Sequence, residues 1–595
     1  MAIAAKMIQQ AGTASTTRTA GTKNAYPTTS QNEPTRELTG SHIICEALVR
    51  EGVELLYGYP GGAIMPFYDA LTAHPSLHHV LVRHEQAAAH AADGYARATG
   101  KVGVCVATSG PGATNLVTGL ATAFMDSIPL VAITGQVASP FIGRDAFQET
   151  DILGVTQPIT KHNFLVRSAD EIAGVIHEAF HIARSGRPGP VLVDIPKDVQ
   201  FAKAQYRPAT MNSEEYGQTQ EITPPPAELI AHAAQLIAQA QRPLIMAGHG
   251  IILSGAYDEL RTLAEKTNMP VITTLLGLSA FPDTHPLHIG MPGMHGPAHT
   301  NHAIGAADLI IGVGLRFDDR VTGNVSQFAP HAQFIHIDID ASEVNKVKVA
   351  IVPIVADAKV ALAALNEAMQ PTDKSAWLQE IRSWETKNNE RIASIEHNDS
   401  YPDPVSILDA IREATKGEAI VVSDVGQHQM WTARFYQWTR RNSHITSGGL
   451  GTMGFALPAA MGVKMGMPDD AVWVVAGDGG FQMNIQELAT LQQEGITLKI
   501  AIMNNGYLGM VRQWQQFFHN HNYSETPITG PDYVKLADAY GLTGMRVTNR
   551  ADVPAAIQQA IETEGTVIID FVIEPEGNVY PMVAPGSAIT NMIEE

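Results

Sequence analysis

The sequence predicts an α/β protein made of three doubly wound parallel-sheet domains. Its 595 residues exceed what one hydrophobic core covers, since a domain usually takes about 100 to 200 residues. From Ser41 onward, short apolar runs rich in Val and Ile alternate with helical stretches. This alternation indicates parallel strands joined by crossover helices, and it places the glycine-rich turns where strands end.

The first domain is predicted at residues 38–205. Its strands are expected at His79–Val82, Val102–Ala107 and Leu130–Thr134, because a turn and a helical pattern follow each of these apolar runs. A linker is predicted at 206–226, since the three consecutive prolines at its end cannot continue a helix.

A central domain is predicted at residues 227–370. It contains apolar runs at Pro243–Gly250 and Asp308–Gly314, which end in paired glycines, and a third run at Phe334–Asp340, which ends in acidic residues. The glycine pairs do not make a full Gly-x-Gly-x-x-Gly fingerprint, so they indicate only a generic nucleotide-binding fold. The charged, helical stretch within 371–400 is interpreted as a second connector.

The third domain is predicted at residues 401–575, followed by a C-terminal tail at 576–595. Strands are expected at Ala419–Ser423, Ala471–Ala476 and Leu498–Met503. Because the strand–helix rhythm resumes here, the first and third domains are predicted to repeat one architecture, although their sequences show no repeat.

Composition excludes several classes of function. The formal charge of −21 and the pI near 5.5 disfavour a nucleic-acid partner. Cys45 and Cys105 are too few for a disulfide framework, which fits a reducing compartment. No apolar run approaches the roughly 20 residues of a membrane-spanning helix. Residues 1–37 are rich in Ser, Thr, Ala and Gly and are predicted to be a disordered tail or, alternatively, a targeting segment.

A metal site is predicted where two neighbouring strands of the third domain end. The run at Ala471–Ala476 leads into Gly477-Asp478-Gly479, and the next strand, which follows an amphipathic stretch at Asn484–Glu494, leads into Asn504-Asn505. Mg²⁺ prefers oxygen ligands, so a carboxylate, an amide and two diphosphate oxygens suit it. In isolation the two segments would be only a turn and a strand end.

Glu85 is the second candidate, because it follows a buried strand and opens the Ala-rich stretch Gln86–Ala98. Alone, an acidic residue there would be a first-turn charge favoured by the helix dipole. Together with the diphosphate motif it fits thiamine diphosphate, which a carboxyl group activates by hydrogen-bonding the aminopyrimidine ring. The imino form of that ring then takes the proton from the thiazolium carbon.

Several motifs of the chain together resemble the catalytic subunit of acetohydroxyacid synthase (acetolactate synthase). They are Tyr59–Ala63, Arg83–Gln86, Thr108–Asn115, Ala146–Glu149, Ser185–Pro190, Arg316–Arg320, Gly448–Gly454 and Gly477–Gly479. The resemblance implies a pyrimidine-binding, a central FAD-binding and a diphosphate-binding domain. It also implies decarboxylation of pyruvate on thiamine diphosphate and transfer of the hydroxyethyl group to pyruvate or 2-ketobutyrate, the first common step of branched-chain amino-acid biosynthesis.

The resemblance assigns the catalytic residues: Glu85 as ring activator, Arg320 as ligand of a ketoacid carboxylate and Trp514 as selector of the second ketoacid, with Gln148 and Lys197 lining the site. A surface ion pair is the alternative for Arg320. The implied metal ligands are Asp478, Asn505 and the carbonyl of Tyr507. Met453 is expected to bend the cofactor, with a core methionine as the alternative.

The remaining residues that the resemblance implies belong to the two cofactor sites. The thiamine diphosphate positions are Tyr59, Gly62, Thr108, Pro111, Asn115, Val425, Gly426, Gln427, His428, Gly451, Met453, Gly477, Gly479 and Gly480. The flavin positions are Arg187, Gly248, Gly250, His295, Gly314, Arg316, Asp318, Asp338 and Asp357. Because the implied reaction has no net redox step, the FAD is expected to be structural.

Rival interpretations are a flavin-dependent pyruvate oxidase of the same fold, an FAD-free catabolic acetolactate synthase and a non-catalytic homologue. The segment Arg316–Arg320 argues against the first two and Trp514 also against the first, and the presence of Glu85, Asp478 and Asn505 argues against the last. The implied partners are small 2-ketoacids, a homodimer or homotetramer and a separate regulatory small subunit. The expected location is the bacterial-type cytoplasm, or a plastid or mitochondrion if the N-terminal tail is a transit peptide.

Overall fold

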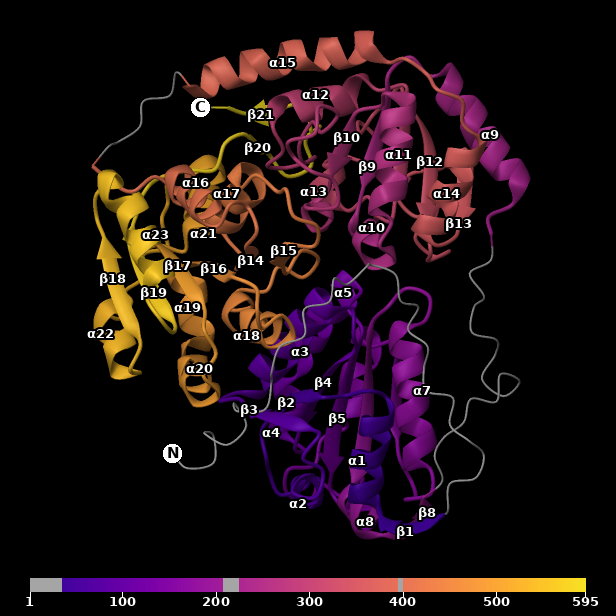
Figure 1. Ribbon diagram of the computed structural model, residues 1–595, viewed down its shortest axis with the longest axis vertical. Coiled ribbons are helices and arrows are strands. Elements are labelled where there is room, and N and C mark those ends of the chain that lie inside the picture. The colour runs from indigo at the N-terminus through magenta and orange to yellow at the C-terminus, as the bar shows by residue number, and fades with distance from the viewer. Residues whose placement is uncertain (1–34, 207–223, 394–399, 595) are drawn as a thin grey trace, which may run out of the picture.

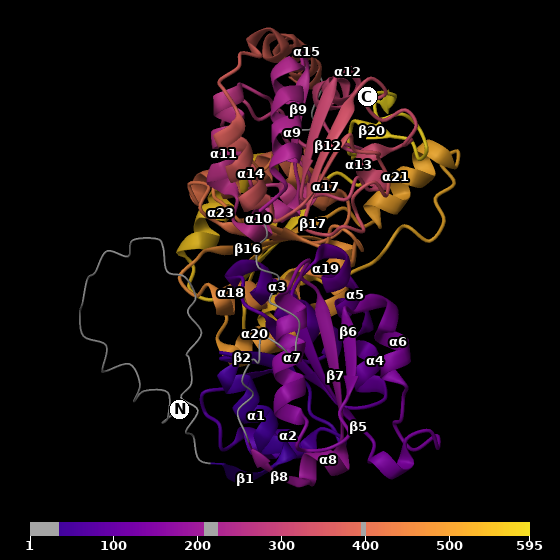
Figure 2. The ribbon, with the colours of Figure 1, turned by 90° about the vertical axis from the view of Figure 1, so that its right-hand side faces the viewer.

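The computed structural model of the protein describes residues 35–206, 224–393 and 400–594 (Figure 1). These residues form three parallel sheets with helices packed against them, which confirms the predicted α/β class. In Figures 1 and 2 the first domain lies below the other two. Most of the predicted N-terminal tail and of the first linker, residues 1–34 and 207–223, falls outside the described ranges.

The first sheet has the strand order β3-β2-β4-β5-β7-β6. The three strands predicted here are confirmed, with ends shifted by no more than two residues. The strands are β2 Leu55–Gly58, β3 His78–Leu81, β4 Gly103–Ala107, β5 Leu130–Gln136, β6 His162–Leu165 and β7 Pro190–Pro196. The helices are α1 Gly40–Arg50, α2 Met65–Leu71, α3 Glu85–Thr99, α4 Pro111–Asn115, α5 Val117–Asp126, α6 Ile152–Thr156, α7 Ile172–Arg184 and α8 Lys197–Phe201.

The central sheet has the order β10-β9-β11-β12-β13. Its strands are β9 Pro243–Ala247, β10 Val271–Thr273, β11 Leu309–Val313, β12 Gln333–Asp338 and β13 Val352–Val355. The helices are α9 Ala227–Gln239, α10 His249–Ser254, α11 Tyr257–Thr267, α12 Ala298–Ala306, α13 Asp319–Thr322, α14 Ala358–Ala368 and α15 Ser375–Ala393. The predicted first strand ends at Ala247 rather than Gly250, because α10 already begins at His249.

The third sheet has the order β15-β14-β16-β17-β19-β18. Its strands are β14 Ile420–Ser423, β15 His444–Thr446, β16 Val472–Gly477, β17 Lys499–Asn504, β18 Thr543–Val547 and β19 Val567–Val572. The helices are α16 Pro404–Ala414, α17 Gln427–Phe435, α18 Ala456–Gly466, α19 Asp478–Phe481, α20 Leu488–Glu494, α21 Gly509–Phe518, α22 Tyr533–Ala539 and α23 Val553–Glu562. Counted within each sheet, this order equals that of the first sheet, so the predicted repeat of architecture is confirmed.

Several segments differ from their predicted form. Residues Arg36–Thr39, partly assigned to the tail, form β1, which pairs antiparallel with β8 Lys203–Tyr206. The stretch at Asn484–Glu494 is a 3-10 turn, η5 Gln482–Glu487, followed by α20. Asn484 leaves the helical conformation there, and its side-chain amide donates to the carbonyl of Gly454 at 2.7 Å.

The C-terminal residues also fold onto the central domain instead of forming a free tail. Strand β20 Met582–Val583 pairs with β21 Met592–Ile593, and Ala588 bridges to Gly323. Ile589 is buried in the same apolar cluster as Phe317. The predicted connector is helix α15, which packs on α12 and buries Trp377 and Ile381 (Figure 1).

The first and third domains meet mainly through helices α3 and α18. Gly94 of α3 faces the carbonyl of Ala459, and Gly462 of α18 faces the carbonyl of Ala91, at distances that leave no room for a Cβ atom. The two helices therefore approach backbone to backbone. This contact brings the start of α3, with Glu85, toward the third domain.

Candidate active site

The carboxyl ends of β16 and β17 carry the predicted metal ligands. The strands are neighbours, with Gly477 opposite Met503. The Asp478 carboxylate accepts a hydrogen bond from the N–H of Gly506 at 3.1 Å, and the Asn505 side-chain oxygen accepts one from the N–H of Tyr507 at 3.1 Å. The structure therefore brings Asp478 and the segment Asn505–Tyr507 together.

This corner favours a cation. Asp478 is buried, and burial raises the pKa of its carboxyl to about 6. The hydrogen bonds that oppose this shift come from backbone N–H groups. A buried carboxylate beside amide oxygens is a donor set that fits Mg²⁺. In the described part of the chain, no three His, Cys, Asp or Glu side chains cluster as a metal site, so further ligands would come from backbone and diphosphate oxygens.

The loop after β14 supplies the other candidates of the third domain. Gly426 has φ 149°, a conformation that favours glycine. Burial lowers the pKa of His428 to about 3, so its ring is neutral. Its Nε2 has no hydrogen-bond partner among the described residues, and a Cβ on Gly477 would collide with its Nδ1. A neutral ring nitrogen is thus held against the glycine-rich turn.

Glu85 is the first residue of α3, at the same edge of the first sheet as the turns after β2 and β4. Its Oε2 accepts a hydrogen bond from the side-chain amide of Asn115 at 2.9 Å. The Thr108 hydroxyl accepts one from the N–H of Ala63 at 3.2 Å, and its side chain fills the space beside Gly61 and Gly112. Adjacent strands β3, β2 and β4 therefore gather Glu85, Thr108 and Asn115, with Tyr59, Gly62 and Pro111 on the same turns.

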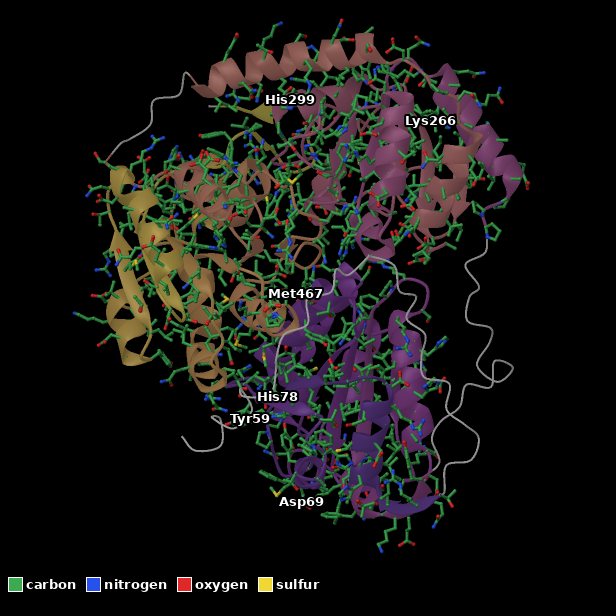
Figure 3. The ribbon with its side chains drawn as sticks, viewed as in Figure 1. Tyr59, Asp69, His78, Lys266, His299 and Met467 are labelled. Atoms are coloured by element: carbon green, nitrogen blue, oxygen red, sulfur yellow. The ribbon has the colours of Figure 1, made fainter. Side chains whose placement is uncertain are left out.

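Gln148 and Lys197 follow β5 and β7, the next strands of this sheet. Gln148 has φ 59° and its backbone packs against Gly110, where a Cβ would not fit. Lys197 opens α8 and is half-buried. Both residues thus lie at the Glu85 edge, which Figure 3 marks by the label of Tyr59.

The rim of this edge is apolar and open in the single chain. Tyr59 is 41% exposed, Met65 58%, Phe141 55%, Phe147 88% and Phe201 61%. Exposed apolar side chains concentrated near one site indicate a surface that another chain covers.

A large cavity of ≈ 2120 Å³ lies where the three domains meet. Its lining includes most of the flavin candidates and several residues of the third domain, but not Glu85, Asp478 or Asn505. The sequence-predicted residues in it are Arg187, Gly250, His295, Gly314, Arg316, Asp318, Arg320, Asp338, Asp357, Val425, Gly426, Gly451, Met453 and Trp514. One chain therefore assembles the flavin and substrate candidates but leaves the Glu85 edge apart from this cavity.

The central-domain glycines have a packing reason of their own. Gly248 and Gly250 face Gly314, which has φ 60°, and neither loop leaves space for a Cβ atom on the other. Burial raises the pKa of Asp338 to about 6 and lowers that of His295 to about 3. The Nδ1 of His295 is buried without a hydrogen-bond partner among the described residues, as expected of a group that meets a ligand.

Other flavin candidates already have partners within the chain. The Arg187 guanidinium pairs with Asp340 at 3.2 Å and Glu343 at 2.9 Å. Asp318 and Asp357 cap helices α13 and α14. Their assignment as flavin-binding residues thus remains a prediction.

Arg320 and Trp514 meet at the cavity. The Arg320 guanidinium carbon lies 5.8 Å from the centre of the Trp514 ring. The ion pair that competes for Arg320 is with Asp319 at 3.8 Å, and both side chains are largely exposed. Such a pair contributes little, so the guanidinium remains available to a carboxylate.

Sequence reasoning missed the buried carboxylates that hold these turns. Asp424 accepts the N–H groups of Val425 at 2.7 Å and Gly454 at 2.9 Å. Asp126 accepts those of Gly448 and Gly449. One signal was present: Asp93 and Arg97, four residues apart, interrupt an otherwise Ala-rich buried helix.

The two cysteines, Cys45 and Cys105, are unpaired and buried. No helix of the described ranges is both long and apolar enough to span a membrane.

Comparison with known proteins gives three family matches. They are thiamine pyrophosphate enzyme, N-terminal TPP binding domain, at residues 38–155; central domain, at 230–365; and C-terminal TPP binding domain, at 424–571. An acetolactate synthase of Mycobacterium bovis is 48% identical over 93% of this chain and 91% of its own. The acetolactate synthase isozyme 2 large subunit of Escherichia coli is 47% identical over 94% and 100%, and the large subunit of Corynebacterium glutamicum 46% over 93% and 89%.

Proposed function

Because the chain belongs to the acetolactate synthase large-subunit family of thiamine pyrophosphate enzymes, we propose that it decarboxylates pyruvate and joins the remaining two-carbon unit to a second 2-ketoacid. Pyruvate as acceptor gives 2-acetolactate, and 2-ketobutyrate gives 2-aceto-2-hydroxybutyrate. The observation that carries the proposal is the presence, in one chain, of the Glu85 edge and the Asp478–Asn505 corner on two sheets of equal strand order.

The third domain would hold the charged end of the cofactor. Asp478, Asn505 and the Tyr507 carbonyl would bind Mg²⁺, and the turn at Gly477–Gly480 would admit the diphosphate close to its N–H groups. His428 offers a neutral ring nitrogen beside this turn. When bound, thiamine diphosphate supplies the carbon nucleophile that adds to the ketoacid carbonyl and stabilises the charge left by decarboxylation.

The first domain would hold and move the proton. The Glu85 carboxyl, oriented by Asn115 at 2.9 Å, would bind the pyrimidine ring of the cofactor. Its burial excludes water from this hydrogen bond. Gln148 and Lys197 would line the same edge and contact the ketoacid.

Arg320 and Trp514 would select the second substrate. The guanidinium has the fork geometry that binds a carboxylate through two hydrogen bonds. The indole beside it would contact the alkyl group of the acceptor and prefer the ethyl group of 2-ketobutyrate over the methyl group of pyruvate.

FAD is part of the proposal and fits the central cavity. The unpartnered Nδ1 of His295, the carboxyl of Asp338 and the paired glycine loops would contact it. Its role would be structural, since the reaction transfers no net electrons. A pyruvate oxidase is disfavoured because the relatives named above are acetolactate synthases. An oxidase would consume oxygen or reduce an electron acceptor when given pyruvate.

The proposed assembly is a homodimer at least, in which a second copy covers the apolar rim and completes the site at Glu85. The support is the exposure of Phe141, Phe147 and Phe201, together with the absence of Glu85 from the lining of the cavity within one chain. A separate small subunit is proposed because the E. coli relative is named a large subunit. A cytoplasmic location is proposed from the two unpaired thiols.

The test is a product assay with pyruvate alone and with added 2-ketobutyrate, in which thiamine diphosphate, Mg²⁺ and FAD are each omitted in turn. We expect acetolactate from pyruvate and 2-aceto-2-hydroxybutyrate from the mixture, both dependent on thiamine diphosphate and Mg²⁺. Oxygen uptake in place of either product would contradict the proposal.

A further inference from the structure

Two buried carboxylates link the first and third domains. Each accepts hydrogen bonds from backbone N–H groups in the part of the candidate site that the other domain contributes. Asp126, at the end of α5, accepts from Gly448 at 3.0 Å and from Gly449 at 2.6 Å. Glu487, the last residue of η5, accepts from the N–H of Arg83 through both oxygens, at 3.0 and 3.2 Å. Each domain therefore fixes a turn that the other contributes.

Asp126 is rigidly placed. Its side chain is inaccessible to solvent and pairs with Arg97 at 2.8 Å, which in turn binds Asp93 and the carbonyl of Thr446. A Cβ on Gly449 would lie 2.9 Å from the Asp126 carboxylate, so only glycine lets the N–H groups reach it. The turn held in this way continues to Met453, which lines the central cavity.

Glu487 is equally constrained. It is fully buried, and the Thr490 hydroxyl donates to it at 2.7 Å. Arg83 precedes Glu85 by two residues, and between them the His84 ring caps α3 by accepting the N–H of Gln86 at 3.1 Å. The Glu487 carboxylate thus holds the backbone just before helix α3, and with it the position of the Glu85 side chain.

We propose that Asp126 and Glu487 are a reciprocal pair of positioning residues: Asp126 places the turn that carries Met453 against the cofactor, and Glu487 places Glu85 against the pyrimidine ring. This inference rests on the proposed function. It predicts that the two residues affect different properties of the enzyme. Merely structural residues would lower stability and all activities together.

The experiment compares Asp126→Asn, Glu487→Gln and the control Asp283→Asn in the complete protein. Asp283 is a half-buried carboxylate that also accepts a backbone N–H across domains, from Trp438 at 3.0 Å, but it lies in neither half of the site. Calorimetry with Mg²⁺ gives the thiamine diphosphate Kd, steady-state assays at saturating cofactor give kcat, and thermal melting gives Tm.

Because misplacing a reacting group by a fraction of an ångström costs about 10-fold or more, we expect Glu487→Gln to lower kcat by about 10-fold with the cofactor Kd unchanged. Asp126→Asn should raise the Kd by about 10-fold, since the turn that contacts the cofactor loses its anchor. Asp283→Asn should change neither quantity, even if its Tm falls. The inference is overturned if Kd and kcat stay at wild-type values, or if all three variants lose both in proportion to Tm.

Isosteric variants keep the test decisive if either carboxamide variant fails to fold. Thr122→Val removes a hydroxyl contact of 2.8 Å to Thr452 in the same turn, and Thr490→Val removes the donor to Glu487. Thr122→Val should raise the Kd and Thr490→Val should lower kcat, each by less than the carboxamide variant, and unchanged values would overturn the inference. The calorimetric Kd is measured without turnover, so a wild-type chain that binds the cofactor but makes no acetolactate would sink the proposed function alone.

Discussion

The first and third domains have the same strand order, yet the side chains at the corresponding edge of each sheet suit different ligands. The first domain offers one carboxyl, Glu85, oriented by an amide and surrounded by exposed apolar side chains. The third offers Asp478 and Asn505, a pair of oxygen donors in a buried polar corner. The topology fixes where a site lies, whereas a few side chains on the turns decide what it does.

The two edges also differ in their exposure to solvent. Burial raises the pKa of Asp478 to about 6, so that corner gains from a cation. The edge that carries Glu85 is instead open at its apolar rim and gains from being covered. In the proposed function the two halves would therefore take different partners, an ion and a protein surface, before they act together.

Removing the acid function of the first domain should have the largest effect. Glu85→Gln keeps the side-chain shape and the contact with Asn115 but cannot move the proton, so turnover should fall by about 100-fold or more. Calorimetry should show diphosphate binding retained. The control Glu494→Gln removes another interdomain carboxylate, bound to His78 (labelled in Figure 3), and should keep full activity. Equal losses in the two variants would refute the assignment.

Removing the charge of the third domain should act on binding instead. Asp478→Asn should weaken Mg²⁺-dependent cofactor binding by about 10-fold or more, because one anionic ligand is lost. Treatment of the wild-type protein with a chelator should mimic it. Asp403→Asn, at the N-cap of α16 in the same domain, should bind the cofactor normally, since asparagine caps a helix equally well. Cofactor binding by Asp478→Asn that is unchanged and insensitive to chelator would contradict the metal site.

Trp514→Leu should change selectivity rather than rate. The variant should still form acetolactate but lose its preference for 2-ketobutyrate, a difference of about 1 to 3 kcal/mol for one methylene group. Competition between the two acceptors measures the product ratio directly. Trp384→Leu, on helix α15 away from the large cavity, is the control, and an unchanged ratio in Trp514→Leu would show that the indole does not select the acceptor.

The smallest expected effect is on the pH dependence of stability, to which buried carboxyl groups of both domains contribute. Burial raises the pKa of Asp194 in the first domain and of Asp424 in the third to about 6, above the roughly 3.9 of an unfolded chain. Because the folded state favours the protonated form, each contributes stability that is full below about pH 4 and lost as the pH rises through 6. Asp194→Asn should remove the contribution of Asp194 to this pH dependence.

Denaturant titration of the cofactor-free protein at pH 4.5 and pH 7 measures this contribution. Relative to wild type, the free energy of unfolding of Asp194→Asn should rise between these values by about 1 to 3 kcal/mol. Parallel pH curves would show that Asp194 titrates normally.

The sequence predicted the fold well where its signals are local. Buried central strands such as β4 and β5 are continuous apolar runs, and the prolines before Ala227 mark the start of α9. The C-terminal segment was assigned to a tail because its strands are only two residues long and pair with each other, which leaves no periodicity to detect. The assigned domain limits stay predictions.

The sequence marks the candidate ligands of the site but not the residues that position them. Asp478, Asn505 and Glu85 stand in short motifs whose spacing reflects the strands that carry them. Asp126 and Glu487 act across domains through backbone N–H groups that any sequence provides, so nothing local marks them. Long-range pairing of this kind becomes visible only in three dimensions.

The central claim, that one working site takes Glu85 from one chain and Asp478 from a second, is tested most directly by complementation. Glu85→Gln and Asp478→Asn chains are co-expressed with different tags, the mixed dimers are purified, and all are assayed at a cofactor concentration at which Asp478→Asn alone is inactive. Each mixed dimer would retain one intact site, so its activity should reach about half that of the wild-type dimer. Mixed dimers as inactive as the parent variants would place both residues in a site within one chain and contradict the account.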